Sequence, residues 1–356
     1  MENNHKKIFL SGGGTGGSVT PLLALYDTLK NENNFEFFWV GTKNGIEKQL
    51  IKAEGLPYIA IPSGKLRRYF SWKNFTDVFL IIAAFFKSLF ILSKHKPTLF
   101  VSAGGFVSVP MAWAAWVMRI PVLIHQQDIR PGLANKLMAP VATKITVTFE
   151  ASLKNYGPKA EWIGNPIRPK IKEIIDIEVA KKSLGINTAK PILLVVGGGT
   201  GAQAINDLLV KSLDKLLPAC EIIHVYGKNK MKEISRPGYH AFALLQNEEM
   251  IKALKIADVV VSRCGLGFLT ELAALKKAAI LIPMPNSHQE DNAQIFADKE
   301  AAIVLDETKI SEEIFADNVF KLLSDDNKKE KLKNKISKVM KENATENVIK
   351  IIKENL

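Results

Sequence analysis

Two patterns of apolar and polar residues alternate along the first half of the chain. Short apolar runs cover residues 6–11, 35–40, 98–102 and 121–125. Residues 21–30, between the first two runs, carry apolar residues at the spacing of an amphipathic helix. Buried strands that alternate with such helices are typical of a parallel sheet with crossover helices. We therefore predict an α/β fold for this half.

The pattern restarts in the second half. Apolar runs there cover residues 191–196, 221–226, 258–262 and 278–283. In both halves the first run leads into Gly-Gly-Gly-Thr-Gly and then into a helical pattern, which residues 205–217 show in the second half. We predict two similar doubly wound domains, 1–165 and 166–337. Residues 165–169 contain two prolines and form the natural linker.

Composition narrows the class of protein. The 356 residues exceed one ordinary domain, and 47% of them are apolar, which is enough for two cores. The net charge of +12 favours anionic partners such as phosphates, nucleic acid or an acidic membrane, although a solvated basic surface explains it equally well. Cys220 and Cys264 form no CxxC pair and no metal-ligand spacing, which argues against a disulfide framework or a zinc site and fits a reducing cytosol. No secretory apolar segment precedes the first predicted strand.

One segment has the composition of a membrane contact. Residues 78–86 are an uninterrupted apolar run of nine residues, about half a bilayer span, so we predict either a buried core helix or a helix lying on a membrane surface. Basic and aromatic residues in the segment 65–73 precede the run, and Lys87 follows it. This combination favours an interfacial patch on an anionic leaflet, with candidates Trp72, Phe85, Phe86 and Lys87.

Both glycine loops match the pattern GxGxxG/A, at residues 12–17 and 197–202. Glycines let the backbone turn tightly and approach a ligand, and the following helix presents N–H groups to an anion. A dinucleotide fingerprint also needs an acidic residue at the end of the second strand. The two second strands end at residues 40–42 and 225–227 without one, which argues against NAD, and the absence of GxxxxGK[ST] argues against an ATPase.

Residues 258–273 are the most informative stretch. A buried strand ends at Ser262, a glycine-rich turn follows, and Glu271 falls in the next helix. Ligands of doubly wound sheets bind beyond the carboxyl ends of the strands, so Glu271 is placed to accept hydrogen bonds from a ribose diol; a solvated or capping role is the alternative. His288 and Gln289 open the next predicted helix, where Gln289 is in position to contact a nucleotide or its sugar and His288 to cap the helix.

In these residues the chain resembles the MurG family, the glycosyltransferase family 28 enzymes that convert lipid I to lipid II in peptidoglycan synthesis. Order and spacing agree over nearly the whole chain. The matching positions are Gly13–Gly17 with Pro21, Gly104–Gly105, Val107–Ser108, Pro110, His125, Gly132–Leu133, Asn135–Lys136, Gly164–Pro166, Arg168, Gly197–Gly198, Gly201–Ala202, Asn206, Arg263, Gly265, Glu271–Ala273, His288–Gln289 and Asn292–Ala293.

The resemblance implies a GT-B fold, two Rossmann-like domains facing across a cleft, with a C-terminal helix at about 338–356 returning to the first domain. It implies UDP-N-acetylglucosamine as donor, an inverting reaction, no cofactor, and work at the cytoplasmic face of the membrane. The implied partners are lipid I, an anionic membrane surface and cell-wall synthesis proteins; no nucleic-acid module is present. The residues carried over for the donor are Thr15, Gly16, Gly17, Asp128, Arg168, Gly199, Arg263, Cys264, Gly265, Leu266, Glu271 and Gln289. Those for the acceptor are Gly104, Gly105, Phe106 and Asn135.

The chain departs from the family pattern at five positions. The family usually carries His, Tyr, Glu, Asn and Ser where this chain has Ser18, Phe106, Gln126, Asp128 and Gly199. With Ser18 in place of the histidine, the candidates for the general base are His125 and Asp128. We favour Asp128, because a carboxylate has replaced a neutral amide while the nearby Glu has become Gln126.

Three other functions remain open. They are a same-fold transferase with another lipid-linked acceptor, a nucleotide-sugar-binding scaffold that has lost catalysis, and a UDP-sugar epimerase. The motif at residues 104–108 together with residues 125–136 favours the lipid I transferase. No D-x-D triplet is present to clamp a metal on the diphosphate, so we expect metal-independent transfer.

Overall fold

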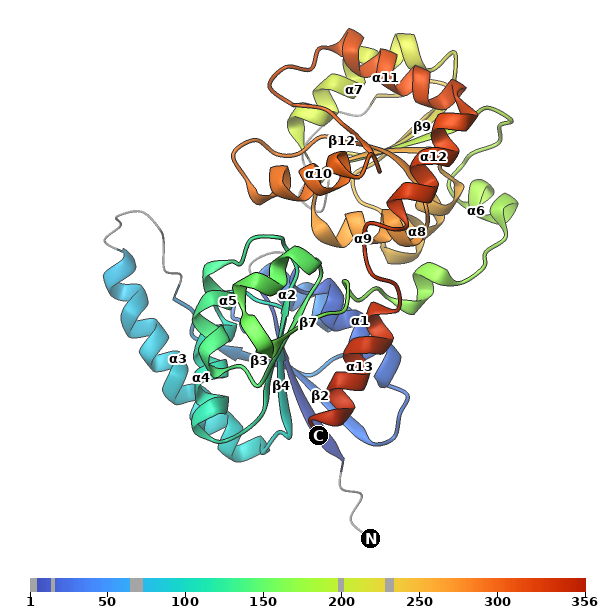
Figure 1. Cartoon of the computed structure of the whole chain (residues 1–356). Coiled ribbons are helices and arrows are strands. Elements are labelled where there is room, and N and C mark those ends of the chain that lie inside the picture. The colour runs from blue at the N-terminus through green and yellow to red at the C-terminus, as the bar shows by residue number, and fades with distance from the viewer. Residues whose placement is uncertain (1–4, 14–16, 65–72, 198–201, 228–233) are drawn as a thin grey trace. The chain divides into compact units, whose positions relative to one another are not determined.

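The computed structural model describes residues 5–13, 17–64, 73–197, 202–227 and 234–356 (Figure 1). The chain divides into two compact units. Unit 1 comprises Met1–Pro169 and Lys341–Leu356, and unit 2 comprises Lys170–Met340. The domain boundaries drawn from the sequence, after residues 165 and 337, stay predictions.

Unit 1 contains a sheet of seven strands in which every neighbouring pair is parallel. Across the sheet the order is β3 (Tyr58–Ile61), β2 (Phe35–Thr42), β1 (Lys6–Ser11), β4 (Leu99–Ser102), β5 (Val122–Gln126), β6 (Lys144–Val147) and β7 (Ala160–Trp162). Strands β4 and β5 are buried along their whole length, because helices cover both faces of the sheet. The chain reverses its direction of winding between β1 and β4, so a ligand site is expected there.

Unit 2 repeats this architecture with six parallel strands. Their order is β10 (Tyr239–Phe242), β9 (Glu221–Val225), β8 (Ile192–Val196), β11 (Val259–Ser262), β12 (Ala278–Leu281) and β13 (Ile303–Val304). Counted within each unit, both sheets contain the order 3-2-1-4-5-6, which is the Rossmann order, and unit 1 adds a seventh strand, β7, beside the sixth. The predicted fold class, two doubly wound α/β units, is confirmed. The switch point of unit 2 lies between β8 and β11.

Helices fill the crossovers. In unit 1 they are α1 (Thr20–Leu29), α2 (Ile46–Ala53), α3 (Lys73–His95), α4 (Ser108–Val117), α5 (Leu133–Met138) and α13 (Ala344–Glu354). In unit 2 they are α6 (Ile177–Ser183), α7 (Gln203–Leu216), α8 (Asn247–Ile256), α9 (Leu266–Ala274), α10 (His288–Asp298), α11 (Glu312–Ser324) and α12 (Asp326–Ile336). Short 3₁₀ segments are η1 (Ala139–Val141), η2 (Glu150–Asn155), η3 (Gly157–Lys159) and η4 (Pro169–Lys172).

The last helix of the chain belongs to the core of the first unit. Helix α13 contacts α1, and its Val348, Ile351 and Ile352 are buried in the same cluster as Leu22 of α1 (Figure 1). The chain passes closely over itself here, since a Cβ on Gly164 would lie 2.4 Å from the carbonyl oxygen of Lys341.

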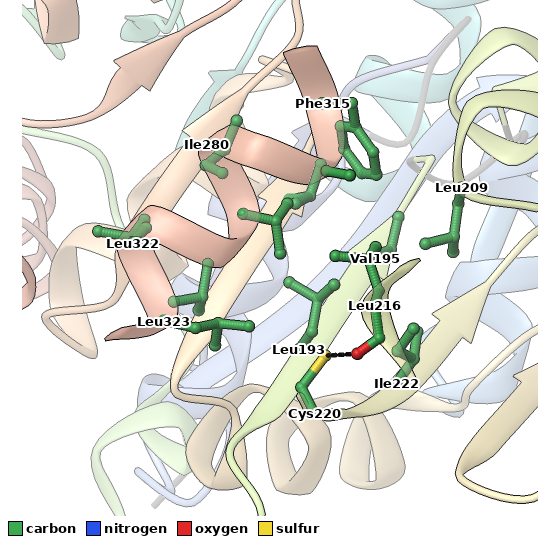
Figure 2. Close-up of a cluster of buried hydrophobic side chains, with 14 of the residues drawn as sticks. Leu193, Val195, Leu209, Leu216, Cys220, Ile222, Ile280, Phe315, Leu322 and Leu323 are labelled. Atoms are coloured by element: carbon green, nitrogen blue, oxygen red, sulfur yellow. Dashed lines mark hydrogen bonds between the residues drawn. The ribbon is translucent and has the colours of Figure 1, made fainter. Parts of the chain in front are cut away.

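One face of the unit 2 sheet is covered by α7 and α11 (Figure 2). Leu193 and Val195 of β8 pack with Leu209 of α7 and Phe315 of α11, and each of the four is fully buried. Cys220 belongs to this cluster, and its thiol donates to the carbonyl oxygen of Leu216 at 3.5 Å (Figure 2). The cysteine is therefore part of the apolar core.

Helix α3 is much longer than the nine-residue apolar run from which it was predicted. It has 23 residues and continues through Lys87 to His95. Its window Asp77–His95 would suffice in length and composition to cross a membrane, but only 22% of that window is buried. Ala84, Ser88 and Leu92 lie on the side of α3 that is buried. Because the rest of the window is exposed, α3 is not a helix enclosed in the core. The opposite side exposes Phe79, Phe86 and Phe90.

Candidate functional site

The first glycine loop and the turn after β4 meet at the switch point of unit 1. Gly104 and Gly105 have φ angles of +99° and +97°, which side chains rarely tolerate. A Cβ on Gly105 would lie 2.5 Å from the carbonyl oxygen of Gly13, so only glycine lets the two backbones lie together. Behind them, the hydroxyls of Ser11 and Ser108 are 2.8 Å apart. The first glycine loop and the turn after β4 are thus packed backbone against backbone at the switch point.

Side chains from two segments hold the far end of the first glycine loop. Gln127 Nε2 donates to the carbonyl oxygen of Gly17 at 3.0 Å. Ser18, the residue in the place of the family's usual histidine, is buried, and its hydroxyl contacts the carbonyl oxygen of Gly13 at 3.4 Å. Ser18 thus closes its own loop. Thr15 and Gly16 lie outside the described residues, as does Gly199 of the second loop.

His125 is enclosed at the end of β5. Its Nδ1 lies 3.0 Å from Thr146 Oγ1, and its Nε2 lies 2.9 Å from Asn165 Oδ1. Burial lowers the pKa of His125 to about 4, so the ring is neutral at neutral pH. A neutral ring with both nitrogens engaged inside the protein is poorly placed to take a substrate proton. His125 therefore has no part in the proposed chemistry.

Asp128 lies in the loop that follows β5, and it is partly exposed. Gln126 supports this loop from beneath, since its Nε2 donates to the carbonyl oxygens of Asp128 at 2.7 Å and Arg130 at 3.3 Å. Asn135, on α5, donates to Gln126 Oε1 at 2.6 Å. Asp128 and Asn135, predicted to serve the base and the acceptor respectively, are thus connected through one buried amide.

Arg168 is committed to two carboxylates. Its Nε lies 2.6 Å from Asp27 Oδ2 and its Nη2 lies 2.9 Å from Glu54 Oε1, and 14% of the side chain is exposed. The guanidinium charge is therefore balanced within unit 1. The structure does not bring Arg168 to the glycine loops as a free cation, so its predicted role at the diphosphate gains no support from the geometry.

Phe106 faces a different surface from its glycine neighbours. It lines an apolar cavity of about 520 Å³ between α3, α4 and α5, within the size range of ligand pockets. The lining residues are Gly64, Ile81, Ile82, Phe85, Phe106, Val109, Pro110, Trp113, Leu133, Ala134 and Leu137. The candidate membrane residue Phe85 is among them, and Lys87 is exposed nearby on α3; Trp72 lies outside the described residues.

In unit 2 an amide from α10 fixes the turn between β11 and α9. Gln289 Oε1 accepts from the backbone N–H groups of Cys264 at 3.2 Å and Met284 at 3.1 Å. Asn292 Nδ2 donates to the carbonyl oxygen of Cys264 at 3.2 Å. Gln289 is partly exposed, and its Nε2 makes no hydrogen bond within the described part of the chain. His288 is exposed at the start of α10.

The N-terminus of α9 is open. Gly265 is its N-cap residue, and a Cβ there would meet nothing within 4 Å. Leu266 begins the helix and is buried, whereas Glu271 on the second turn is partly exposed. A helix N-terminus offers unpaired N–H groups and a positive dipole end to an anion. The predicted donor residues Gly265, Glu271 and Gln289 are therefore gathered on neighbouring elements of one unit.

Two further predicted donor residues brace this turn. Arg263 Nη1 donates to the carbonyl oxygens of Ile282 and Pro283, each at 3.1 Å, and its Nη2 pairs with Glu307. Burial raises the pKa of the Cys264 thiol to about 12, so this thiol stays protonated and unreactive. The geometry gives both side chains a structural role, and only the backbone of Cys264 faces the turn.

Sequence reasoning missed Glu47 and Tyr156. Glu47 is fully buried, accepts from Thr42 Oγ1 at 2.6 Å, and has an oxygen 3.0 Å from where a Cβ on Gly13 would lie. Tyr156 donates to Gln126 Oε1 at 2.8 Å. A glutamate in the first turn after the second strand was a usable signal for Glu47, whereas nothing local in the sequence distinguishes Tyr156. Within the described ranges, no group of three His, Cys, Asp or Glu is arranged to hold a metal ion.

Comparison with known proteins adds a family to this geometry. Residues 8–147 match the glycosyltransferase family 28 N-terminal domain, and residues 192–351 match the family's C-terminal domain. A protein of Clostridium kluyveri is 40% identical over 98% of this chain and 99% of its own length. One of Clostridium tetani is 39% identical over 98% of each chain. Both are named UDP-N-acetylglucosamine–N-acetylmuramyl-(pentapeptide) pyrophosphoryl-undecaprenol N-acetylglucosamine transferase.

Solved structures give the same answer at the level of the fold. The crystal structure of Acinetobacter baumannii MurG aligns with a TM-score of 0.75 at 25% identity, covering 98% of this chain and 99% of that one. A UDP-GlcNAc 2-epimerase from Neisseria meningitidis aligns with a TM-score of 0.68 at 12% identity, covering 98% and 100%, which is a likeness of fold alone. These matches confirm the predicted GT-B class.

Proposed function

The chain belongs to glycosyltransferase family 28, and from that premise we propose that it transfers N-acetylglucosamine from UDP-N-acetylglucosamine to the lipid-linked muramyl-pentapeptide, lipid I, giving lipid II. One observation carries the proposal: relatives about 40% identical over 98% of the chain are named for this reaction. The enzyme is a hexosyltransferase of peptidoglycan synthesis, and its substrates are a nucleotide sugar and an undecaprenyl-linked sugar.

Unit 2 binds the donor in this proposal. The diphosphate lies at the N-terminus of α9, whose Gly265 leaves open space and whose dipole favours an anion. Glu271 accepts from the ribose hydroxyls, and Gln289 Nε2 donates to the nucleotide. The two bonds that Gln289 Oε1 receives from the backbone hold its amide in this orientation before the ligand arrives. The second glycine loop and its helix α7 supply further N–H donors.

Unit 1 supplies the acceptor side. The acceptor hydroxyl attacks the anomeric carbon, the bond from that carbon to the diphosphate breaks, and UDP leaves with the electron pair while the configuration inverts. Asp128 takes the hydroxyl proton, because it is the partly exposed carboxylate in the loop beyond β5. N–H groups at the loops stabilise the leaving diphosphate. Gly104, Gly105 and Asn135 bind the acceptor sugar.

Helix α3 provides the contact with the membrane. Phe79, Phe86 and Phe90 are 72%, 64% and 68% exposed on one side, and Lys87 stands beside them. Aromatic and basic residues together bind an anionic leaflet through apolar burial and charge. The other side of α3 packs into unit 1, so we propose a helix that lies on the cytoplasmic face of the membrane as part of a folded domain.

The deciding experiment is transfer of labelled N-acetylglucosamine from UDP-N-acetylglucosamine to a short-chain lipid I analogue, with and without EDTA. Product at an enzyme-like rate in both conditions supports the donor, the acceptor and metal independence together. Product only without EDTA retains the reaction and contradicts metal independence. No product in the presence of tight UDP binding contradicts the reaction, and points to another lipid-linked acceptor or to a nucleotide-sugar-binding scaffold.

A further inference from the structure

A buried amide connects the two groups that unit 1 offers to the acceptor. The side chain of Gln126 is 2% exposed and makes four hydrogen bonds. Its nitrogen donates to the carbonyl oxygens of Asp128 and Arg130, and its oxygen accepts from Asn135 and Tyr156. Both donors and both acceptor positions of the carboxamide are therefore used, so the side chain has one orientation.

The orientation of the Gln126 amide also determines the orientation of the Asn135 amide. Carbonyl oxygens only accept, so the nitrogen of Gln126 must face Asp128 and Arg130, and its oxygen must face Asn135 and Tyr156. Asn135 must then present its nitrogen to Gln126, at 2.6 Å. The oxygen of the Asn135 carboxamide is left pointing the other way, toward Gly104.

That oxygen is an unused acceptor at the predicted acceptor site. Asn135 is 5% exposed, and its Oδ1 is buried and makes no hydrogen bond with any described residue. A Cβ on Gly104 would lie 3.1 Å from it, so Oδ1 faces the backbone of the Gly104–Gly105 turn and a side chain at position 104 would crowd it. A buried acceptor without a donor costs free energy, which an O–H or N–H group of a bound sugar recovers.

We propose that Gln126 is a positioning residue that sets the Asp128 loop and the free oxygen of Asn135 in one arrangement. This inference rests on the proposed function, because it assigns the network to the binding of the acceptor and the removal of its proton. Gln126 touches neither substrate. It acts by holding the backbone carbonyl of Asp128 on one side and the amide of Asn135 on the other.

The network requires a neutral amide at position 126. A carboxylate there would still accept from Asn135 and Tyr156, but it would face the carbonyl oxygens of Asp128 and Arg130 with no hydrogen to offer. Neither Tyr156 nor His125 would supply a compensating positive charge. Tyr156 is held protonated because burial raises its pKa, and His125 is neutral at neutral pH. Asp128 adds a carboxylate two residues away.

Substitutions of Gln126 separate the hydrogen bonds that its side chain donates from those that it accepts. Gln126→Glu removes the hydrogen bonds to the carbonyl oxygens of Asp128 and Arg130. We therefore expect turnover per UDP-binding site to fall about tenfold at pH 8, with both KM values close to wild type. Turnover recovers as the pH falls, because a protonated carboxyl donates once more to the carbonyl oxygen of Asp128. Gln126→Met also removes the hydrogen bonds that Oε1 accepts from Asn135 and Tyr156. The KM for the acceptor should then rise as well, while the KM for the donor should not. Asn155→Asp is the matched control, since it makes the same change of amide to acid on the neighbouring exposed turn.

The pH dependence of the Tm of the Gln126→Glu variant tests the network without any substrate. In the Gln126→Glu variant, the pKa of the introduced carboxyl should be higher in the folded state than in the unfolded state. The Tm of this variant relative to wild type is then highest below the unfolded pKa and falls as pH rises through the folded pKa. Wild-type turnover and a pH profile like that of the control in Gln126→Glu would overturn the inference. Absence of transfer by the unsubstituted enzyme would instead overturn the proposed function, and a flat Tm difference would overturn the network.

Discussion

The two units have the same strand order but present different chemistry at their switch points. In unit 1, the amide of Gln126 supports the loop that carries the carboxylate of Asp128, and it also accepts from Asn135 on α5, whose own oxygen makes no hydrogen bond with a described residue. In unit 2, the amide of Gln289 supports the turn before α9, and what faces outward is a helix N-terminus with hydrogen-bond donors. The first arrangement suits a hydroxyl that must lose a proton, and the second suits a diphosphate.

The exposed surfaces of helix α3 in unit 1 and helix α11 in unit 2 also differ. Helix α3 of unit 1 exposes three phenylalanines along one side, above an apolar cavity. On α11 of unit 2, Ile314 and Phe320 are exposed, but the helix also carries acidic residues in its first turn. Contiguous exposed apolar surface marks an interaction site, whereas scattered apolar residues are ordinary. Under the proposed function, the same scaffold serves a lipid-linked acceptor in unit 1 and a nucleotide in unit 2.

The largest expected effect separates the roles of the units in catalysis. Asp128→Asn removes the proposed base while keeping the size of the side chain, so kcat should fall about a hundredfold, the lower range of general-base effects. The affinity for UDP, which this comparison assigns to unit 2, should stay within about twofold. Steady-state kinetics and calorimetric titration with UDP measure the two quantities. Unchanged turnover would remove Asp128 from the mechanism.

How far the sequence predicted this molecule depends on the range of the interaction. Strand β1 and the alternation with helices follow from local periodicity, and the glycine loops follow from local spacing. The short strands β7 and β13 carry no comparable signal, because edge strands of two or three residues show no periodicity. The apolar run of residues 78–86 does not show the full length of α3, because Lys87 and Ser88 interrupt it; within the helix Lys87 is exposed and the Ser88 hydroxyl donates to the carbonyl oxygen of Ala84.

The site was predictable in its residue types but not in its contacts. Glu271, Gln289 and the glycines could be named from motif spacing. The pairing of Arg168 with Asp27, 141 positions away, and of Gln126 with Tyr156 depends on tertiary packing that no local window contains. The same packing encloses His125, whose residue type alone made it a candidate base.

Acid should weaken both units through one buried histidine each. Burial lowers the pKa of both His125 and His224 to about 4 from an ordinary 6.5. Between these pH values the unfolded chain binds more protons than the folded one, so the free energy of unfolding falls as the pH falls. From pH 7 to pH 5 each histidine should cost about 2 kcal/mol, at about 1.4 kcal/mol per pH unit below 6.5. Urea unfolding at the two pH values measures this loss.

Single substitutions assign that loss to its unit. His224→Gln should remove its share of the pH dependence from unit 2, and His125→Gln should do the same for unit 1. A pH dependence unchanged in both variants would show that other groups are responsible.

The donor site should respond in binding more than in turnover. Glu271→Gln keeps the shape but removes the charge that strengthens hydrogen bonds to the ribose, so the Kd for UDP should rise about tenfold. At saturating donor, kcat should change by less than about threefold, the reverse of the pattern expected for Asp128→Asn. Glu290→Gln on the exposed side of α10 is the control. Equal UDP affinity in the Glu271→Gln variant and the control would place the ribose elsewhere.

The smallest expected effect tests the contrast between the outer helices. Phe86→Ser removes one exposed aromatic from α3 without touching the buried side of the helix. Partial burial of a phenylalanine in a bilayer interface contributes about 1 kcal/mol, so partitioning onto anionic vesicles should fall about fivefold. Phe320→Ser on α11 is the matched control, because that side chain is 52% exposed but belongs to unit 2, and its partitioning should stay at the wild-type level. Equal losses in the two variants would mean that the membrane does not distinguish the units. A loss confined to Phe86→Ser on anionic but not on neutral vesicles would place Lys87 and its basic neighbours in the same contact.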